Sequence, residues 1–349
     1  MSLASRFNGK GVLGAFALWL AVAVVVLVLS ISLAVSLGAV RVPLGTVWGV
    51  IAHHVAPGLF AHGGWETAHE AIVWQLRLPR TLLAALVGAG LAVVGATLQA
   101  VTRNPLADPH LLGISSGGAF GAIVALLHTG LIFGLATVPI FAFIGALFAT
   151  ALVLTVSRIA HATSSDRLVL AGVAVSFIVM ALANVMIFLG DPRATHTVVF
   201  WMLGGLGLAQ WSQLAFPLVV LIGCTLWFLL RARDFDAMTI GDETASTLGI
   251  NVTGFRLMAF VMGALVTGVM VAFSGIIGFV GLMVPHIVRM VVGGANIRVL
   301  PAGVVTGAIF LVWCDILART VMAPDDIPIG VVTGLIGGVF FVWLLRKRS

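Results

Sequence analysis

The segment Arg233–Arg256, RDFDAMTIGDETASTLGINVTGFR, is a polar island between long apolar runs. Only 30 of the 349 residues are Asp, Glu, Lys or Arg, and seven of these lie between Arg231 and Arg256. Apolar runs long enough to cross a bilayer stand on both sides of the segment. The island is therefore predicted to lie in water at a membrane surface.

This polar segment carries the local signals of one short helix. Thr239 followed by Asp242 matches the capping-box pattern of a helix start. Gly249 stands where a helix ends in a left-handed turn. A helix of about nine residues between these points is marginal in water by itself. We expect it either to pack on its own protein or to dock against a partner.

The composition places the chain among helical membrane proteins. Hydrophobic residues make up 61% and charged residues 9%, which leaves too little polar cover for a soluble fold. Continuous apolar runs of about 20 residues fit spanning helices and do not fit the alternating strands of a β-barrel. The 41 glycines suit helices that pack closely in lipid. Membrane topology accounts for the net charge of +6, so nucleic acid is not an expected partner.

Ten spans are predicted, in a single transmembrane domain that covers residues 1–349. The first, residues 12–37, is too long for the core of a signal peptide and is predicted to be a retained span. A polar segment at 38–79 follows it, and a short amphipathic piece is predicted at Val198–Leu208. The other nine spans are expected at about 81–101, 112–128, 134–157, 168–190, 211–230, 254–273, 276–293, 300–322 and 328–345.

The distribution of basic residues sets the orientation. With both termini in the cytoplasm, 13 of the 18 basic residues fall in inner loops, as the positive-inside rule requires. This orientation also places the polar island in the cytoplasm. Five basic residues oppose the bias and need another explanation: Arg41, Arg77, Arg80, Arg193 and Arg319.

Motifs of several functional classes are absent from the sequence. It has no G-x-x-x-x-G-K-[ST] and no H-E-x-x-H, so neither ATP binding by a P-loop nor a zinc-protease site is predicted. The nine histidines are scattered, and Cys224 and Cys314 lie in apolar segments, so neither a metal site nor a disulfide is expected. Asp315 is the main acidic residue inside a span and can pair with Arg319 one turn away. The otherwise bare span centres argue against a proton-coupled carrier.

A second unusual stretch is Arg103–Gly121, RNPLADPHLLGISSGGAFG. Two prolines break the helix within six residues, and four glycines then permit close helix contact. Its first part, Arg103–Gly118, resembles the signature loop of the permease subunits of importers for vitamin B12, ferric siderophores and haem. The resemblance covers residues 75–345 and includes, in the right order, RLPR at 77–80, GDETASTLG at 241–249, GFVGLMVPHIVR at 278–289, LPAGVVTGA at 300–308 and DIPIGVVTGLIGG at 326–338.

This resemblance implies a type II ABC importer permease, a homodimer of ten-span subunits around a central path in the bacterial inner membrane. The chain itself would be no enzyme and would bind no cofactor, because ATP and Mg²⁺ would be held by two cytoplasmic ATP-binding cassette subunits. Thr239–Gly249 resembles the coupling helix that sits in a groove of each ATPase subunit. The residues expected to form this helix are Thr239, Gly241, Asp242, Glu243, Ala245, Leu248 and Gly249.

The resemblance also implies a periplasmic binding protein that docks on the outer face. Arg77, Arg80 and Arg319 match the family's outward arginines and are expected to clamp Glu side chains on its two lobes. Bidentate Arg–carboxylate contacts would fix its orientation. Anchoring of lipid headgroups is the alternative role for each arginine.

An inner gate and a translocation path are implied in the same way. The gate is expected at Asn104 and Leu106 in one loop and at Thr163 and Ser164 in another, with ordinary turn residues as the alternative. The path is expected along the face of Val175–Leu189 and the short helix after it, with Asn184, Arg193, His196 and Trp201. A mostly apolar lining would let a bulky ligand pass through weak, multiple contacts.

The substrate is less well specified than the class of protein. Haem is slightly favoured over a ferric siderophore, and vitamin B12 is third, because Arg193 and His196 could meet propionates and iron. Solvated loop residues are the alternative for both. Two other functional classes stay open: an ion-coupled secondary transporter, and a membrane scaffold that transports nothing.

Overall fold

The computed structural model describes residues 9–60, 63–109, 113–159 and 165–348, and within these ranges the chain is helical with no strand. The predicted all-α fold is confirmed. The elements in order are α1 (Gly9–Ser36), α2 (Leu44–Val55), α3 (Thr67–Ala71), η2 (Ile72–Arg77), α4 (Leu78–Thr102), α5 (Ile114–Val124), η4 (Ala125–Thr129), η5 (Gly134–Ala136), α6 (Thr137–Ile159), α7 (Ser165–Leu189), α8 (Pro192–Met202), α9 (Trp211–Leu230), α10 (Ala232–Ile240), α11 (Asp242–Thr247), α12 (Val252–Ser274), α13 (Val280–Val292), α14 (Asn296–Thr320) and α15 (Ile329–Arg348).

Seven helices of the described residues are long and apolar enough to cross a membrane. They are Gly14–Ser36, Thr67–Thr102, Gly134–Ile159, Val169–Leu189, Trp211–Leu230, Val252–Ser274 and Asn296–Thr320. Three shorter apolar helices, Ile114–Thr129, Val280–Val292 and Ile329–Leu344, stand at the positions of the remaining predicted spans. The chain is therefore a multi-pass membrane protein with its apolar helices where the sequence placed them.

The segment 38–79, which we expected to be polar, is largely helical. It forms α2 and the start of a helix that runs without a break from Thr67 to Thr102 through α3, η2 and α4. Three valines of this segment, Val47, Val50 and Val73, are fully buried in one cluster. Burial of these side chains and the continuous backbone hydrogen bonds of the helix stabilise this segment, although its histidines gave it a polar sequence.

Two other boundaries are also corrected. The short helix after α7 is α8, which begins at Pro192 because the Asp191 carboxylate accepts the Arg193 backbone N–H at 2.8 Å, so it starts earlier than Val198. The eighth predicted span begins only at Val280, because α12 ends at Gly275 with a positive φ of 67°.

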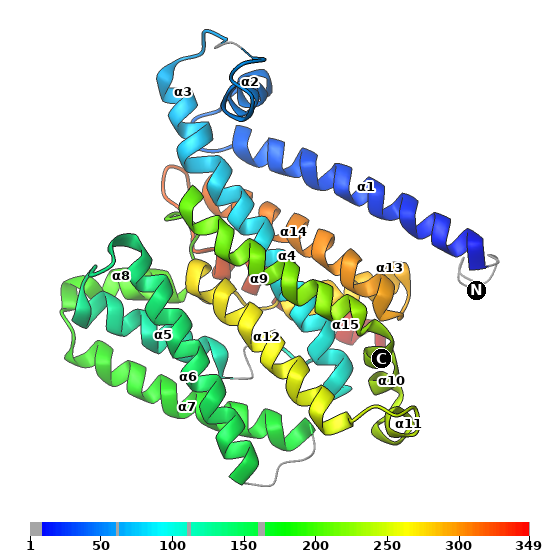
Figure 1. Cartoon of the computed structure of the whole chain (residues 1–349). Coiled ribbons are helices and arrows are strands. Elements are labelled where there is room, and N and C mark those ends of the chain that lie inside the picture. The colour runs from blue at the N-terminus through cyan, green and yellow to red at the C-terminus, as the bar shows by residue number, and fades with distance from the viewer. Residues whose placement is uncertain (1–8, 61–62, 110–112, 160–164, 349) are drawn as a thin grey trace.

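α4 lies at the centre of the bundle and is buried along nearly its whole length. It packs against α14, α12, α13 and α9 (Figure 1). Glycines make this close approach possible: a Cβ on Gly88 would lie 2.1 Å from the Gly307 carbonyl oxygen, and one on Gly95 would lie 2.0 Å from that of Gly281. Because lipid tails are as apolar as the side chains, such tight backbone packing replaces the hydrophobic drive of a soluble core.

α5 to α8 form a second group beside this core (Figure 1). α5 and α6 approach closely at Gly117 and Gly145, where a Cβ on either would meet the other's carbonyl oxygen at 2.3 or 2.2 Å. α7 presents an apolar face that the rest of the described chain leaves exposed, with Phe177 74% and Phe188 86% accessible. A face of this kind fits contact with lipid or with another subunit.

The polar elements lie at opposite ends of the bundle. α2 and α3 stand at one end, and α10 and α11 stand at the other (Figure 1). α1 begins and α15 ends on the side that carries α10 and α11. This arrangement agrees with the predicted topology, in which the polar island and both termini share one side of the membrane.

The crossing of α4 and α14 gives a matched test on one helix. Gly307→Ala would place a Cβ 2.3 Å from the Gly88 carbonyl oxygen, whereas Gly303→Ala would meet no atom within 4 Å. We expect Gly307→Ala to lower stability by about 1–3 kcal/mol through overpacking, and Gly303→Ala to leave it unchanged or slightly raised. Thermal unfolding of the detergent-solubilised protein measures both. Equal melting temperatures for the two variants would contradict the close crossing.

Candidate functional site

The polar island folds into two short helices, α10 and α11, rather than the single helix that we expected from Thr239 to Gly249. Thr239 lies inside α10, where its hydroxyl donates to the Phe235 carbonyl at 2.9 Å, so it is not the N-cap. The reason is packing: Phe235 and Met238 are fully buried. Their burial extends α10 to Ile240. Gly241 then precedes α11, whose first residue is Asp242.

The predicted end of α11 at Gly249 is confirmed. Gly249 has φ +84°, and its N–H donates to the Ser246 carbonyl at 2.9 Å while the Ile250 N–H donates to the Ala245 carbonyl at 3.0 Å. This pair of bonds closes a helix around a left-handed glycine. Ala245 is buried, whereas Glu243 and Leu248 are exposed. One side of α11 therefore rests on the bundle and the other faces outward.

Asp242 joins α11 to two other elements. The Arg256 side chain, from α12, donates from Nη2 to both Asp242 carboxylate oxygens at 2.8 and 2.9 Å. Its Nε donates to the Val101 carbonyl of α4 at 3.3 Å. Arg103 adds a second guanidinium, 3.6 Å from the same carboxylate. The start of α11, the end of α4 and the start of α12 thus meet in one polar contact.

The first of the two predicted gate loops begins where α4 ends. Asn104 forms a turn in which its Oδ1 accepts the Leu106 N–H at 2.9 Å, and Leu106 is 56% exposed. Asn104 is exposed as well. Thr163 and Ser164 of the second predicted loop lie outside the described residues. The gate role of all four positions stays a prediction.

The outer arginines do not project as expected. Arg77 and Arg319 are only 8% and 6% exposed, and both turn toward the end of α1. Arg77 donates to the carbonyls of Val35 at 2.9 Å and Ser36 at 3.0 Å, and Arg319 donates to that of Ala34 at 3.0 Å. The last carbonyls of a helix have no partner within it, and positive charge is favoured there. These two guanidinium groups cap α1, and the expectation that they face outward is wrong.

Arg80 completes a buried charge cluster beside them. Its Nε lies 2.8 Å from Asp315, and its Nη1 donates to Asp326. Asp315 is also 3.0 Å from Arg319, which confirms the predicted pair one turn apart. The Arg80 side chain is 14% exposed, so it reaches the surface only in part. The geometry leaves docking of a binding protein by these arginines as a prediction.

The predicted path residues fall on two elements and are not equally accessible. Asn184 lies on the exposed face of α7, and Arg193 and His196 are exposed on α8. Trp201 is partly buried and packs against the cluster of Ala119, Ile123 and neighbouring side chains. His196 lines a hollow of about 600 Å³ with four apolar side chains and two acids, Asp325 and Asp326, and the second acid also accepts from Arg80.

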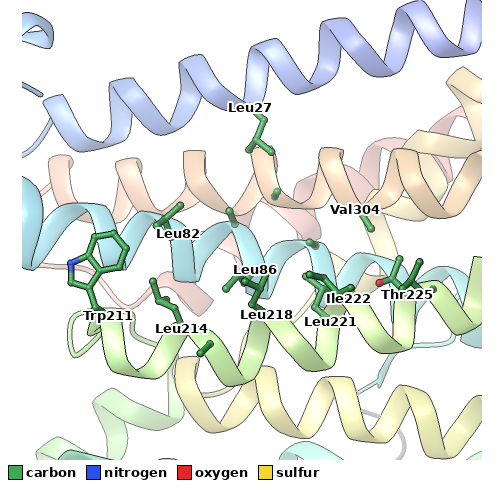
Figure 2. A pocket seen from close by; sticks show the side chains of 15 residues that line it. Leu27, Leu82, Leu86, Trp211, Leu214, Leu218, Leu221, Ile222, Thr225 and Val304 are labelled. Atoms are coloured by element: carbon green, nitrogen blue, oxygen red, sulfur yellow. The ribbon is translucent and has the colours of Figure 1, made fainter. Parts of the chain in front are cut away.

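A separate cavity of about 580 Å³ lies between α1, α4, α9 and α14. Figure 2 shows Leu27 of α1 on one side of it and Leu218 and Ile222 of α9 on the other. The lining is apolar except for Thr225. Because a polar chelate would find almost no hydrogen-bond partner there, this cavity is a poor candidate for the translocation path.

Several functional contacts escaped the sequence analysis. Gln99 is buried in α4, donates to the Gly281 carbonyl at 3.1 Å and accepts from Arg289, which also donates to the Ala96 carbonyl. A lone amide inside an apolar span was the available signal for this network. Asp236 accepts both the backbone N–H and the side-chain amide of Asn296 at 2.8 Å and so caps α14. Sequence spacing alone gives no sign of that contact.

The chain is similar over most of its length to known permeases. The model of the FecCD transport family matches residues 24–347. The hemin transport system permease protein HmuU of Yersinia pestis is 40% identical over 293 residues, which cover 82% of this chain and 87% of that protein. The vitamin B12 import system permease protein BtuC of Citrobacter koseri is 39% identical over 289 residues, with the same coverage of 82% and 87%.

A solved structure supports the same relationship. It is described as an inward-facing conformation of a metal-chelate type ABC transporter and has a TM-score of 0.79 and 29% identity to this chain. The match covers 94% of this chain and 98% of the other. The fold is therefore shared over most of the chain.

The capping of α1 can be tested at Arg77. Arg77→Met keeps an apolar stem of similar length but removes the donors to the Val35 and Ser36 carbonyls. We expect a loss of about 1–3 kcal/mol, because the Val35 carbonyl loses its donor in a buried place while the Ser36 carbonyl keeps only the Val42 N–H at 3.1 Å. Arg41→Met, at an exposed arginine of the same end, is the control. Thermal unfolding in detergent should separate the two variants, and matching transitions would disprove the cap.

Proposed function

This chain belongs to the FecCD transport family and is a permease of the ABC importer type, and from that premise we propose that it moves an iron chelate inward across the bacterial inner membrane. The driving force would come from two cytoplasmic ATP-binding cassette subunits, which hold ATP and Mg²⁺. The sequence of this chain has no P-loop of its own. A periplasmic binding protein would deliver the ligand at the opposite end.

The exposed surface of α11 is the observation that carries this proposal. Leu248 is 67% exposed and Ile240, just before α11, is 72% exposed, although both stand on a polar end of the bundle. An open hollow of about 630 Å³ lies along α11 and the start of α12, lined by Glu243, Ser246 and Thr247 among others. Apolar side chains beside acidic and hydroxyl groups are suited to a protein partner, because the first supply burial and the second supply specificity.

A homodimer fits the exposed face of α7. Phe177 and Phe188 stand out from this face, and Asn184 lies on the same helix stripe between them. A second copy facing this stripe would enclose a mainly apolar path, with Arg193 and His196 of α8 toward its outer mouth. Both chain termini and α11 would then lie on the cytoplasmic side, as the distribution of basic residues favours.

Paired charges favour ATP over an ion gradient as the source of energy. Asp315, the buried acid of α14, lies 2.8 Å from Arg80 and 3.0 Å from Arg319. This carboxylate is tied to two guanidinium groups inside the fold, so the ion pairs give it a structural role. This observation counts against the secondary transporter that the sequence had left open.

Haem is the iron chelate that we favour. His196 is exposed at the outer end of the proposed path and can ligate iron, and Arg193 on the same helix can pair with a propionate. HmuU, which is named for hemin, supports this choice. Vitamin B12 is the second candidate, because BtuC is almost equally similar. The carboxylates of Asp325 and Asp326 near His196 are the feature that speaks against a doubly anionic ligand.

A direct measurement separates these ligands. The soluble binding protein that works with this permease is titrated with haemin and with cyanocobalamin, and binding is followed by absorbance. The same two compounds are then offered to vesicles that hold the permease and its ATPase subunits. We expect saturable haemin binding and ATP-dependent haemin uptake. Cyanocobalamin uptake in the absence of haemin uptake would replace haem by B12.

Docking on α11 is tested by a charge at its apolar tip. Leu248→Glu should lower the amount of co-purifying ATPase subunit at least about tenfold, because a buried carboxylate in the interface costs more than 1.4 kcal/mol. Leu59→Glu is the matched control: Leu59 is 82% exposed but stands in the outer segment. Quantified pull-down in mild detergent provides the readout. Undiminished co-purification with Leu248→Glu would remove the docking surface from α11.

A further inference from the structure

We propose that Asp242 and Arg256 are positioning residues that join α11 to the end of α4, so that α11 and the Asn104–Leu106 loop move as one unit. This inference rests on the proposed function, because the movement to be passed on is that of the ATPase subunits. It goes further by naming the contact through which the movement reaches the predicted gate.

The first step is that α11 depends on this contact. α11 has six residues, and a helix of that length does not persist in water by itself. Asp242 is its first residue, where a negative charge interacts favourably with the exposed N–H groups of the helix start. Arg256 holds both oxygens of that carboxylate, and its side chain is only 6% exposed. A charge-assisted contact with a buried guanidinium is short and strong, so it holds α11 in position although the Asp242 side chain is 39% exposed.

The second step is that the same guanidinium reaches α4. Its Nε donates to the carbonyl of Val101, one residue before α4 ends at Thr102. That carbonyl belongs to the last turn of the helix and has no partner within it. A planar guanidinium can serve the carboxylate and the carbonyl together, which the single ammonium of a lysine cannot do in the same geometry. One side chain of α12 thus bridges α11 and α4.

The third step leads from α4 into the loop. Arg103 follows α4 directly in a left-handed conformation with φ +52°, and its guanidinium is 3.6 Å from Asp242. Asn104 then closes a turn, because its Oδ1 accepts the Leu106 N–H and its carbonyl accepts the Ala107 N–H at 3.1 Å. Hydrogen bonds or ion pairs hold each residue from Val101 to Asn104, and Leu106 and Ala107 both donate to Asn104, so the turn encloses Pro105. A displacement of α11 can therefore reach Leu106 through contacts without a flexible gap.

A purely structural role makes a different prediction from a positioning role. If the pair only stabilises the fold, its loss lowers the melting temperature, ATP hydrolysis and the response of the gate loop together. If the pair passes on movement, ATP hydrolysis survives while the response of the gate loop is lost. The experiment must therefore record both quantities on the same sample.

The test uses the full complex of the permease with its ATPase subunits in lipid nanodiscs. A Leu106→Cys background carries an environment-sensitive fluorophore on the gate loop, and Cys224 and Cys314 are buried. Fluorescence is compared before and after ATP with vanadate, and hydrolysis is measured in parallel. The variants are Asp242→Asn and Arg256→Lys. Asp234→Asn is the control, because Asp234 of α10 pairs with Arg231 three residues away and not with α4.

We expect both variants to reduce the fluorescence response at least about fivefold, the lower range of an allosteric coupling. Arg256→Lys lies in α12, outside the docking surface, and keeps a positive charge beside Asp242, so it should also keep hydrolysis within about twofold. Asp234→Asn should leave the response unchanged. A full response in either variant, or a parallel fall of response, hydrolysis and melting temperature in Arg256→Lys, would overturn the inference. If the unmodified complex itself shows no nucleotide-dependent response, or holds no ATPase subunit, the proposed function fails as well.

A second variant covers the case in which Asp242→Asn does not fold. Arg103→Ala removes the other guanidinium from Asp242, and the Arg103 side chain is 45% exposed, so little packing is lost. We expect an unchanged melting temperature and a response reduced about twofold, in keeping with the weaker contact of a half-exposed pair. An unchanged response in this variant would count against the inference.

Discussion

The lack of water inside a bilayer governs how this chain uses its few charges. Every helix end leaves carbonyl or N–H groups without partners, and lipid offers none. The structure meets this need with ionised side chains: Arg77 and Arg319 serve the end of α1, Arg256 serves the end of α4, and Asp236 serves the start of α14. The charged residues that the composition makes so scarce are thus placed mainly where a helix stops.

α4 connects these ends into one architecture. Its outer end adjoins the arginine cluster, its middle is held against α14 and α13 by Gly88 and Gly95, and its inner end meets Asp242 through Arg256. At these two glycines backbone meets backbone, and buried side chains fill the rest of the contact, so the helix has little freedom to bend. α4 therefore behaves as the stiff axis around which the other helices are arranged.

The spans could be predicted from the sequence because a long continuous apolar run forms a helix when it crosses lipid. α9 has the predicted bounds, 211–230, since polar residues stand at both of its ends. The helices of segment 38–79 were not predicted because its three buried valines stand among histidines. The start of α11 was predicted wrongly because burial of Phe235 extends α10 past the local capping pattern. Tertiary burial thus overrides local helix-capping and polarity patterns in the sequence.

The arginines show a second limit of the sequence. Charge bias indicates on which side of the membrane Arg77 and Arg319 lie, but not whether each guanidinium turns outward or inward. The direction of the Arg77 side chain is decided by backbone carbonyls of α1, more than 40 residues earlier in the chain. Every residue has such a carbonyl, so the sequence does not mark the ones that serve as partners. Sequence spacing likewise does not determine the docking and gate roles, which rest on family resemblance.

The brevity of α11 has an evolutionary meaning. A six-residue element closed by Gly249 and anchored at Asp242 owes its shape to these two points and to buried Ala245, so its exposed side chains contribute little to that shape. Substitution of these few exposed residues could adapt the proposed docking surface to a different ATPase subunit while the transmembrane helices stay the same. The surface that binds the ATPase subunit and the transmembrane helices would then change in sequence at different rates.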